Sequence, residues 1–262
     1  MTGGYGPRMT AEKARTLRDL HLAPALLQVV NVWDAVSAQV VAGVPGTTAI
    51  ATASHSIAAS HGYADGENIP VELVLAACAR IVAAVDLPVS ADLESGYGDV
   101  HATVRRAIGV GVVGANLEDG MRPLAESVHA VEAAVSAGED EGVPFVLNAR
   151  TDAFVKPGEP AEQLAAAIER GRAYLDAGAT CVFVPGRLSA EQIGSLVEGL
   201  GERRLSVIGV PGTPLPAELE ALGVARVSYG PLTQRVALAA LQATATDLLA
   251  GGGLPDGIPA LN

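Results

Sequence analysis

Eight short apolar runs, rich in β-branched residues, recur along the chain and are separated by loops and helical patterns. The runs are LLQVVN from Leu26, TTAIAT from Thr47, PVSADLE from Pro88, VVGANLED from Val112, PFVLNARTD from Pro144, TCVFVPG from Thr180, LSVIGVPG from Leu205 and ARVSYGP from Ala225. Strands that are apolar on both faces and alternate with helices predict a parallel sheet. Eight such units in a chain of this length are typical of a closed (β/α)8 barrel. The sequence therefore predicts a TIM-type α/β barrel, with a doubly wound open sheet as the alternative.

The 262 residues contain no linker with a shift in composition, so residues 1–262 are expected to form a single domain. The last helical pattern, residues 231–250, carries Ala and Leu on several faces. Such a helix can bury itself against another subunit as readily as against its own barrel. We expect a homo-oligomer, a dimer or a tetramer, in which this helix is exchanged between subunits.

Composition excludes several classes of partner. The formal net charge is −12 and there is no long basic run, which argues against nucleic acid or an anionic membrane. Two cysteines, Cys78 and Cys181, lack metal-binding spacing and are expected to be buried thiols. The N-terminus shows no signal-peptide pattern, and no stretch of 18 apolar residues occurs. These features predict a soluble cytoplasmic protein.

Polar side chains end three consecutive runs: Asp92 and Glu94, then Glu118 and Asp119, then Asn148, Arg150 and Asp152. In a strand, side chains two residues apart share a face, so Asp92 and Glu94 are expected to point the same way. A single rim carboxylate can simply cap a helix or pair with an arginine. Carboxylates crowded on adjacent strands, however, repel one another unless a cation offsets them. Oxygen ligands without His or Cys favour Mg²⁺, or Mn²⁺, over Zn²⁺.

Arg150 ends an apolar strand, where a guanidinium needs a partner. It is interpreted as the anchor for a ligand carboxylate, the alternative being a structural ion pair with Glu118 or Glu94.

Four other residues are candidates for the mouth of the barrel. His55 and His61 could exchange protons near neutral pH or be ordinary surface histidines. Trp33 and Asp34 could line the pocket or cover the barrel mouth.

The ordered motifs GYADGE, ADLESGYGD, GANLED and NARTDA resemble the isocitrate lyase/phosphoenolpyruvate mutase superfamily, over residues from about Asn31 to Tyr229. The resemblance implies that the chain binds Mg²⁺, mostly through waters, and a small anionic carboxylate substrate. The implied metal residues are Asp92, Glu94 and Glu118; the implied catalytic residues are Asp65, Glu118 and Arg150; the implied substrate residues are Thr52, Ala53, Ser54, Arg150 and Trp33. Arg150 would hold the substrate carboxylate.

The departures from the family pattern narrow the activity. The lyases of the family carry a K-[KR]-C-G-H segment after the L-E-D motif, whereas this chain reads LEDGMRPLAES, with Arg122 as the one charged residue of a short loop. The Lys and Asn of phosphoenolpyruvate mutases are also missing there. Gly186 stands where methylisocitrate lyases have Glu.

The leading functional hypothesis is a Mg²⁺-dependent enzyme, a decarboxylase or lyase, that cleaves a C–C bond of a small 2-oxo acid or dicarboxylate through a pyruvate-like enolate. Decarboxylation needs no protein nucleophile and so fits the missing Cys. One alternative is a phosphonopyruvate hydrolase or C–P mutase. An alternative of another class is a non-catalytic protein that binds 2-oxo acids, favoured by the short loop after Glu118.

Overall fold

A computed structural model describes residues 7–259, and its centre is a closed barrel of eight parallel strands. The strands are β1 (Leu27–Val32), β2 (Ile50–Thr52), β3 (Val89–Asp92), β4 (Gly114–Glu118), β5 (Val146–Arg150), β6 (Cys181–Val184), β7 (Leu205–Ile208) and β8 (Arg226–Ser228). Each predicted run contains one strand. Because β1 pairs with β8, with Leu27 opposite Arg226, the sheet has no edge, and the single (β/α)8 barrel is confirmed over the open sheet.

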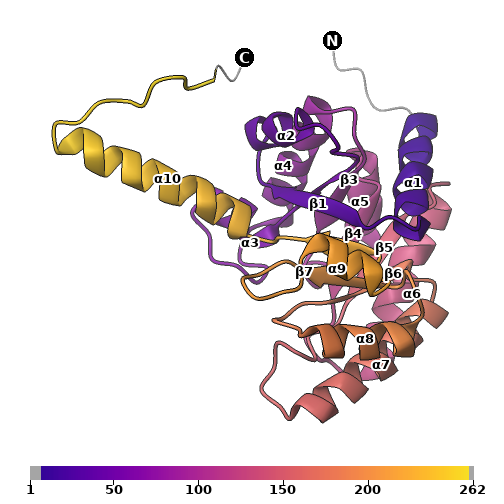
Figure 1. Ribbon diagram of the computed structural model, residues 1–262. Coiled ribbons are helices and arrows are strands. Elements are labelled where there is room, and N and C mark those ends of the chain that lie inside the picture. Colours follow the sequence, from indigo (N-terminus) through magenta and orange to yellow (C-terminus); the bar gives the residue numbers. More distant parts are fainter. Residues whose placement is uncertain (1–6, 260–262) are drawn as a thin grey trace.

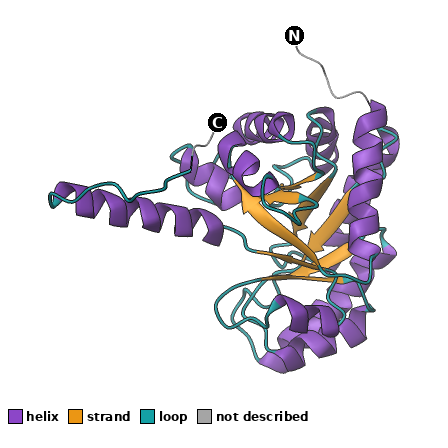
Figure 2. Ribbon diagram, turned by 45° about the horizontal axis from the view of Figure 1, so that its top comes forward, coloured by secondary structure: helices purple, strands orange, loops and turns teal. Residues whose placement is uncertain are grey.

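Helices surround the strands, as Figures 1 and 2 show. They are α1 (Pro7–Leu22), α2 (Ala35–Ala42), α3 (Ser54–Ser60), α4 (Val71–Ala84), α5 (Val100–Gly109), α6 (Leu124–Asp140), α7 (Pro160–Asp176), α8 (Ala190–Leu200), α9 (Pro216–Ala221) and α10 (Leu232–Leu249). Small and β-branched side chains fill the space between the two layers, and Cys78 and Cys181 are buried among them, as expected. None of the described helices combines the length and apolar character needed to cross a membrane.

Helix α1 packs against the N-terminal end of the barrel through Leu17. A Cβ atom on Gly114 would lie 2.9 Å from Leu17 Cδ2 and 2.6 Å from the Val146 carbonyl oxygen. Glycine at the start of β4 therefore allows α1 to approach the strands closely, at a point where any side chain would displace backbone.

The barrel lumen carries a buried cation near α1. Arg226 is 1% exposed, and its one hydrogen bond among the described residues runs from Nη1 to Ser90 Oγ, 3.3 Å away. Burial lowers the pKa of Arg226 to about 10. His21 is fully buried, and its Nδ1 donates to the Leu17 carbonyl oxygen at 2.8 Å, so the neutral ring leaves Nε2 as an acceptor. Burial, followed by the charge of Arg226, lowers the pKa of His21 to about 3.

Helix α10 departs from the barrel pattern. It follows β8, but it projects away from the barrel in both views (Figures 1 and 2). Its first turn is tied to the barrel: Thr233 Oγ1 donates to the Asn31 carbonyl oxygen at 2.8 Å, and the buried Gln234 donates to the Ser56 carbonyl oxygen at 3.0 Å. Beyond that turn, apolar side chains are exposed, including Val236 at 71% and Leu241 at 63%.

The buried His21 makes stability depend on pH. The unfolded chain protonates this ring near its ordinary pKa of 6.5, whereas the folded chain does so only near 3. The stabilisation is therefore complete above pH 6.5 and is lost as pH falls toward 3. We expect the free energy of unfolding to drop by about 2 kcal/mol more between pH 7 and pH 5 in the wild type than in His21→Gln.

Urea denaturation at the two pH values measures this difference. His129→Gln is the matched control, because the His129 side chain is 84% exposed. Equal pH dependence in wild type and His21→Gln would contradict a neutral buried imidazole.

Candidate active site

Asp92 is the last residue of β3, and hydrogen bonds orient its carboxylate at the C-terminal rim of the barrel. Its Oδ2 accepts hydrogen bonds from Ser54 N at 3.1 Å and Ser54 Oγ at 2.8 Å. Its own N–H donates to Thr52 Oγ1 at 2.9 Å. The segment from Thr52 to Ser54, expected to bind substrate, thus also orients the Asp92 carboxylate from the end of β2.

A cavity of about 170 Å³ opens at this rim. Its lining comes from the ends of seven strands and the loops that follow them: Asn31, Ala53, Ser54, His55, Asp65, Asp92, Asn116, Arg150, Phe183, Pro185, Ile208, Ser228, Gly230 and Pro231. Of the residues predicted from the sequence, the cavity brings together Ala53, Ser54, Asp65, Asp92 and Arg150. Thr52 lies just behind this lining, bonded to Asp92.

The position of Arg150 is compatible with both roles considered from the sequence, a structural ion pair and an anchor for a ligand carboxylate. Its Nη1 lies 2.7 Å from Glu118 Oε2, and its Nε lies 2.7 Å from Asp152 Oδ1, so it is a structural ion pair. It also lines the cavity, and no contact with the described residues uses its Nη2. A guanidinium has five N–H donors, so Arg150 can bind a carboxylate while remaining paired.

Glu118 lies behind Arg150 and has an unusual acidity. Burial raises its pKa to about 7 against the attraction of Arg150, and the charges of Asp92, Asp152 and Glu94 act in the same direction as burial. A cation near these acids would favour the ionised form of Glu118.

Asp65 reaches the cavity from the loop between α3 and α4, and its side chain is 49% exposed. Its carboxylate lies 3.4 Å from Ser54 Oγ, whose one proton is donated to Asp92, and 3.5 Å from His55 Nδ1. His55, one of the two histidines singled out from the sequence, therefore lines the cavity beside an acid that can orient its ring.

The prediction that Asp92 and Glu94 share one face of a strand is wrong. Strand β3 ends at Asp92, and Glu94 adopts a left-handed backbone conformation with φ of +50°. Glu94 is 3% exposed, and it accepts hydrogen bonds from Tyr97 OH at 2.8 Å and from Glu67 N. Burial raises the pKa of Glu94, while these two bonds act to lower it. Its carboxylate is engaged outside the cavity lining.

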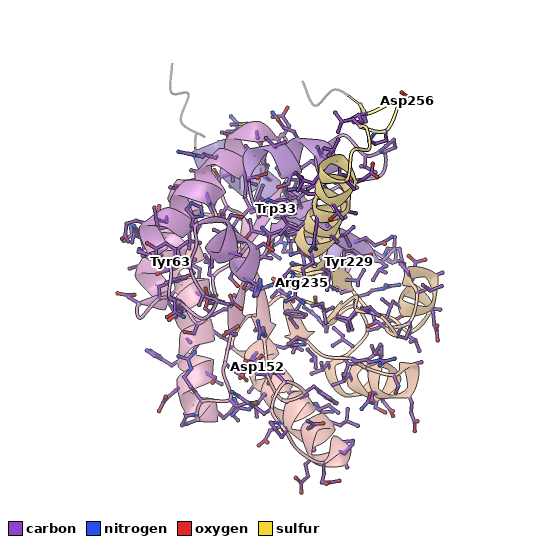
Figure 3. The ribbon with its side chains drawn as sticks, turned by 90° about the vertical axis from the view of Figure 1, so that its left-hand side faces the viewer. Trp33, Tyr63, Asp152, Tyr229, Arg235 and Asp256 are labelled. Atoms are coloured by element: carbon purple, nitrogen blue, oxygen red, sulfur yellow. The ribbon has the colours of Figure 1, made fainter. Side chains whose placement is uncertain are left out.

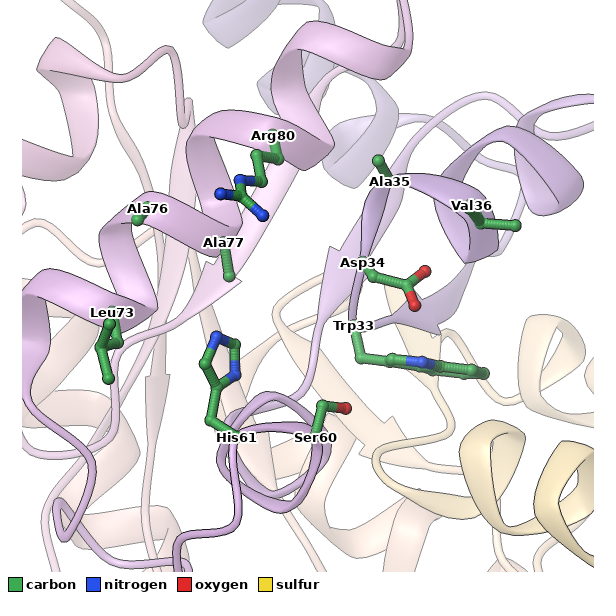
Figure 4. A pocket seen from close by; sticks show the side chains of 10 residues that line it. All are labelled: Trp33, Asp34, Ala35, Val36, Ser60, His61, Leu73, Ala76, Ala77 and Arg80. Atoms are coloured by element: carbon green, nitrogen blue, oxygen red, sulfur yellow. The ribbon is translucent and has the colours of Figure 1, made fainter.

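Trp33 and His61 lie away from the rim cavity. Both line a surface depression of about 300 Å³ between α2 and α4, into which His61 and Arg80 point (Figure 4). Trp33, labelled in Figure 3, also borders a second depression near the base of α10, together with Thr233. The structure thus does not bring Trp33 to the substrate residues. Asp34 caps α2 by accepting from Ser37 N.

The short loop after Glu118 is fixed by its own backbone. Arg122 donates from Nε to the Asp119 carbonyl oxygen at 3.1 Å and from Nη2 to the Glu118 carbonyl oxygen at 3.1 Å. Helix α6 then begins at Leu124. Arg122 closes this loop rather than facing the cavity.

A second network, missed in the sequence, anchors the same loop. Asp119 is 3% exposed and accepts from Tyr174 OH at 2.7 Å, from Arg170 Nη1 at 3.1 Å and from Asp152 N at 3.0 Å. Arg170 and Tyr174 lie on α7 at helical spacing, and that spacing is the only sequence signal that could have indicated a shared target.

Asn31 and Asn116, which line the cavity, were also missed in the sequence analysis. Asn31 accepts from Tyr229 N at 2.7 Å and Gly230 N at 2.8 Å, which joins β1 to the loop after β8. Asn116 accepts from Asn148 Nδ2 at 2.8 Å, on the neighbouring strand β5. Asn116 lies two residues before Glu118 on β4, so strand alternation was a usable signal for it.

Among the predicted metal residues, Asp92 is the one best placed to bind a magnesium ion. Among residues 7–259, no three His, Cys, Asp or Glu side chains are gathered into a ready cage. Mg²⁺, however, is commonly held by one or two carboxylates and several waters. Asp92, with Asp65 on the same cavity wall and Glu118 behind Arg150, offers that oxygen-only chemistry. Glu94 lies outside the cavity lining, and its carboxylate accepts hydrogen bonds from Tyr97 and Glu67.

Known proteins resemble this chain in family and fold over most of its length. The family described as phosphoenolpyruvate phosphomutase matches residues 17–249. A provisionally assigned phosphonomutase structure from Burkholderia cenocepacia J2315 is 42% identical, with a TM-score of 0.85 over 90% of this chain and 99% of that one. The structure of an oxaloacetate acetylhydrolase with 3,3-difluorooxalacetate is 28% identical, with a TM-score of 0.84 over 94% and 90% of the two chains.

A curated relative, the 2,3-dimethylmalate lyase of Eubacterium barkeri, is 30% identical over 80% of this chain and 77% of its own. Together with the family match, which spans nearly the whole barrel, this confirms the resemblance inferred from the four motifs. The chain belongs to the phosphoenolpyruvate mutase/isocitrate lyase superfamily of lyases and mutases.

Proposed function

We propose that this protein is a Mg²⁺-dependent enzyme that cleaves a C–C bond of a small 2-oxo acid or dicarboxylate through a pyruvate-like enolate. The observation that carries the proposal is a single cavity faced by an oriented acid, Asp92, and by a guanidinium with free donors, Arg150. One end of the site suits a hydrated cation, and the other suits a carboxylate.

The size of the cavity favours a small substrate. At about 170 Å³ it is below the ~300–1,000 Å³ of pockets that hold drug-sized ligands. Phe183 and Ile208 supply apolar walls, so the polar recognition is concentrated on Asp92, Arg150 and the Ser54 hydroxyl. Such a site selects short acids by orientation and charge.

Each residue has a separate task in this reaction. When bound, Mg²⁺ would stabilise negative charge on the substrate oxygen as the bond next to the carbonyl breaks. Asp92, held by Ser54, would supply the direct carboxylate ligand, and Arg150 would hold the substrate carboxylate with the bond to be cleaved directed into the cavity. Mn²⁺ suits the same oxygen donors.

The departing enolate needs a proton, and His55 is the residue best placed to provide one. It lines the cavity, and its Nδ1 lies 3.5 Å from the Asp65 carboxylate. A neighbouring acid can orient an imidazole ring toward a substrate. His55 and Asp65 would therefore act as a pair on the cavity wall opposite Arg150.

Relatives support C–C cleavage, and one supports a second candidate. The relatives named 2,3-dimethylmalate lyase and oxaloacetate acetylhydrolase bear the names of small-acid enzymes. The 42% identity to the provisionally assigned phosphonomutase favours C–P chemistry on phosphonopyruvate as the second candidate. The fold alone does not choose between the two.

The deciding experiment is an assay of pyruvate or oxalate release from oxaloacetate, substituted malates, methylisocitrate and phosphonopyruvate, each with Mg²⁺ and with EDTA. Metal-dependent turnover of a carbon acid supports the proposal. Turnover of phosphonopyruvate alone selects the second candidate. If no substrate is turned over but 2-oxo acids raise the melting temperature, the protein is a non-catalytic binding protein instead.

Asp92→Asn keeps an acceptor for Ser54 but removes the charge that attracts the cation. We expect metal-dependent turnover to fall by at least about 100-fold, because the charge stabilisation at the reacting oxygen is lost. Calorimetric titration with Mg²⁺ should show weakened binding, with the melting temperature near that of wild type. Asp86→Asn, an exposed acid outside the site, is the control; an equal loss in both variants would contradict the assignment.

Arg150→Lys preserves the positive charge but removes the planar guanidinium. That group contacts Glu118 and Asp152 and is proposed to hold the substrate carboxylate. We expect oxalate, used as a substrate-like dicarboxylate, to bind about tenfold more weakly, since charge-assisted bidentate contacts cannot be formed by an ammonium. Arg122→Lys is the control, because Arg122 contacts only backbone carbonyl groups. Unchanged oxalate affinity in Arg150→Lys would leave Arg150 with a structural role alone.

We also propose that α10 is buried against a second copy of the chain, giving a homo-oligomer. Five of its side chains are more than 40% exposed although they are large and apolar: Val236, Leu238, Leu241, Leu248 and Leu249. Helix α2 exposes Val36 and Val40 at the depression at the base of α10, and Val44 is exposed just after the helix. Exchange of α10 between two copies would cover both apolar surfaces.

Leu241→Glu should therefore shift the protein toward monomer in light scattering coupled to size-exclusion chromatography, because the new charge would be buried in the contact. Gln242→Glu places the same charge one residue further along the helix and should leave the assembly unchanged at matched concentration. A monomeric wild-type protein would disprove this assembly.

A further inference from the structure

The loop that carries Asp65 is fastened to the turn after β3 by two glutamates. Glu67 Oε1 accepts three hydrogen bonds, from Ser95 N at 3.0 Å, Ser95 Oγ at 2.7 Å and Tyr97 N at 2.7 Å. In return, Glu67 N donates to Glu94 Oε2, and Tyr97 OH donates to Glu94 Oε1 at 2.8 Å. We call these four residues, Glu67, Glu94, Ser95 and Tyr97, the Glu67 latch.

The backbone of the latch is strained at the positions that supply its side chains. Glu67, Glu94 and Tyr97 have φ of +59°, +50° and +52°, in the left-handed region. A glycine would adopt this conformation at lower cost at each position. The side chain of each of the three nevertheless takes part in the hydrogen bonds of the latch. These bonds offset the cost of the left-handed backbone.

Asp65 depends on the latch for its position. Its own contacts, 3.4 Å to Ser54 Oγ and 3.5 Å to His55 Nδ1, are long and half-exposed, and such contacts hold a loop weakly. Glu67 lies two residues further along, and its bonds are shorter and partly buried. Asn68 Nδ2 donates to the Asp65 carbonyl oxygen at 2.7 Å and makes the intervening turn compact.

We propose that Glu67 is a positioning residue that clamps the 61–70 loop onto the turn after β3 and so holds Asp65 at the cavity beside His55. Glu94 serves the same clamp from the opposite side, which gives this buried acid a role other than metal binding. The catalytic consequence of the clamp rests on the function proposed above, whereas its structural consequence can be measured without any turnover.

The first test is hydrogen exchange followed by mass spectrometry on the 61–70 segment. Glu67→Ala removes the acceptor of three bonds, and we expect exchange in this segment to rise at least about tenfold, with the β4 and β5 segments unchanged. Glu67→Gln retains an oxygen acceptor and should stay close to wild type. Tyr97→Phe removes only the bond to Glu94 and should give an intermediate rise.

Glu72→Gln is the matched control, since Glu72 lies on α4 and pairs with Arg106 at the surface. Wild-type exchange in both Glu67→Ala and Tyr97→Phe would overturn the latch. If Glu67→Ala fails to fold, Tyr97→Phe decides the question: faster exchange in the 61–70 segment supports the latch, and wild-type exchange overturns it.

The second test is a double-mutant cycle on kcat/KM. If Glu67 acts through Asp65, Glu67→Ala should lower kcat/KM in the wild type but change it less than twofold in an Asp65→Asn background. Equal effects in both backgrounds would show that Glu67 does not act through Asp65. Faster exchange without any metal-dependent turnover would uphold the clamp and reject the proposed function. Metal-dependent turnover together with unchanged exchange in Glu67→Ala would uphold the proposed function and reject the clamp.

Discussion

The rim of this barrel is organised by an excess of negative charge around one guanidinium. Arg150 bonds two acids directly, Glu118 and Asp152, while three more lie nearby: Asp65, Asp92 and Glu94. Each acid must be offset by hydrogen bonds, by Arg150 or by a cation, because like charges held in partly buried positions repel strongly. Ser54 meets this need for Asp92, and Tyr97 and Glu67 N meet it for Glu94. Glu118, whose pKa burial raises to about 7, is the acid whose charge is least well offset, and a cation would complete the balance.

Glu118 and Asp119 are adjacent in the sequence, but their surroundings affect their acidity in opposite ways. Burial acts to raise the pKa of Asp119, but hydrogen bonds from Asp152 N, Tyr174 OH and Met121 N lower it, and Arg170 pairs with it. Asp119 is thus a permanently ionised anchor that fastens the loops after β4 and β5 to α7. Glu118 ends β4 on the side that faces Arg150 and keeps a changeable protonation state. Asp119 therefore fastens the loops around the site, and the protonation of Glu118 can change when a ligand binds nearby.

The sequence predicted the parts of this structure that depend on periodicity. All eight strands, the closed barrel and the rim positions of Asp92, Glu118 and Arg150 follow from apolar runs that end in polar residues. Alternation fails once a strand ends, which is why Glu94 was assigned to the face of Asp92 although its backbone turns left-handed. Trp33 was misjudged because nothing in a strand-end pattern says which way the next loop turns. Contacts that link distant segments, such as Glu67 with Ser95 and Asp119 with Tyr174, have no local signal.

Two loops at the rim of the barrel differ in what they contribute to the cavity. The loop after Glu118 is short, and Arg122 fastens it to its own backbone, so it contributes no side chain to the cavity lining. The loop between α3 and α4 reaches the cavity with Asp65 and is held by bonds of 2.7–3.0 Å to the turn after β3. A reaction through an enolate requires a covered site and a proton donor of fixed orientation. Under the proposed function, one loop is too short for either role, so both would fall to the segment that carries Asp65 and to His55 beside it. Strain at Glu67, Glu94 and Tyr97 is the structural cost of keeping that segment in place.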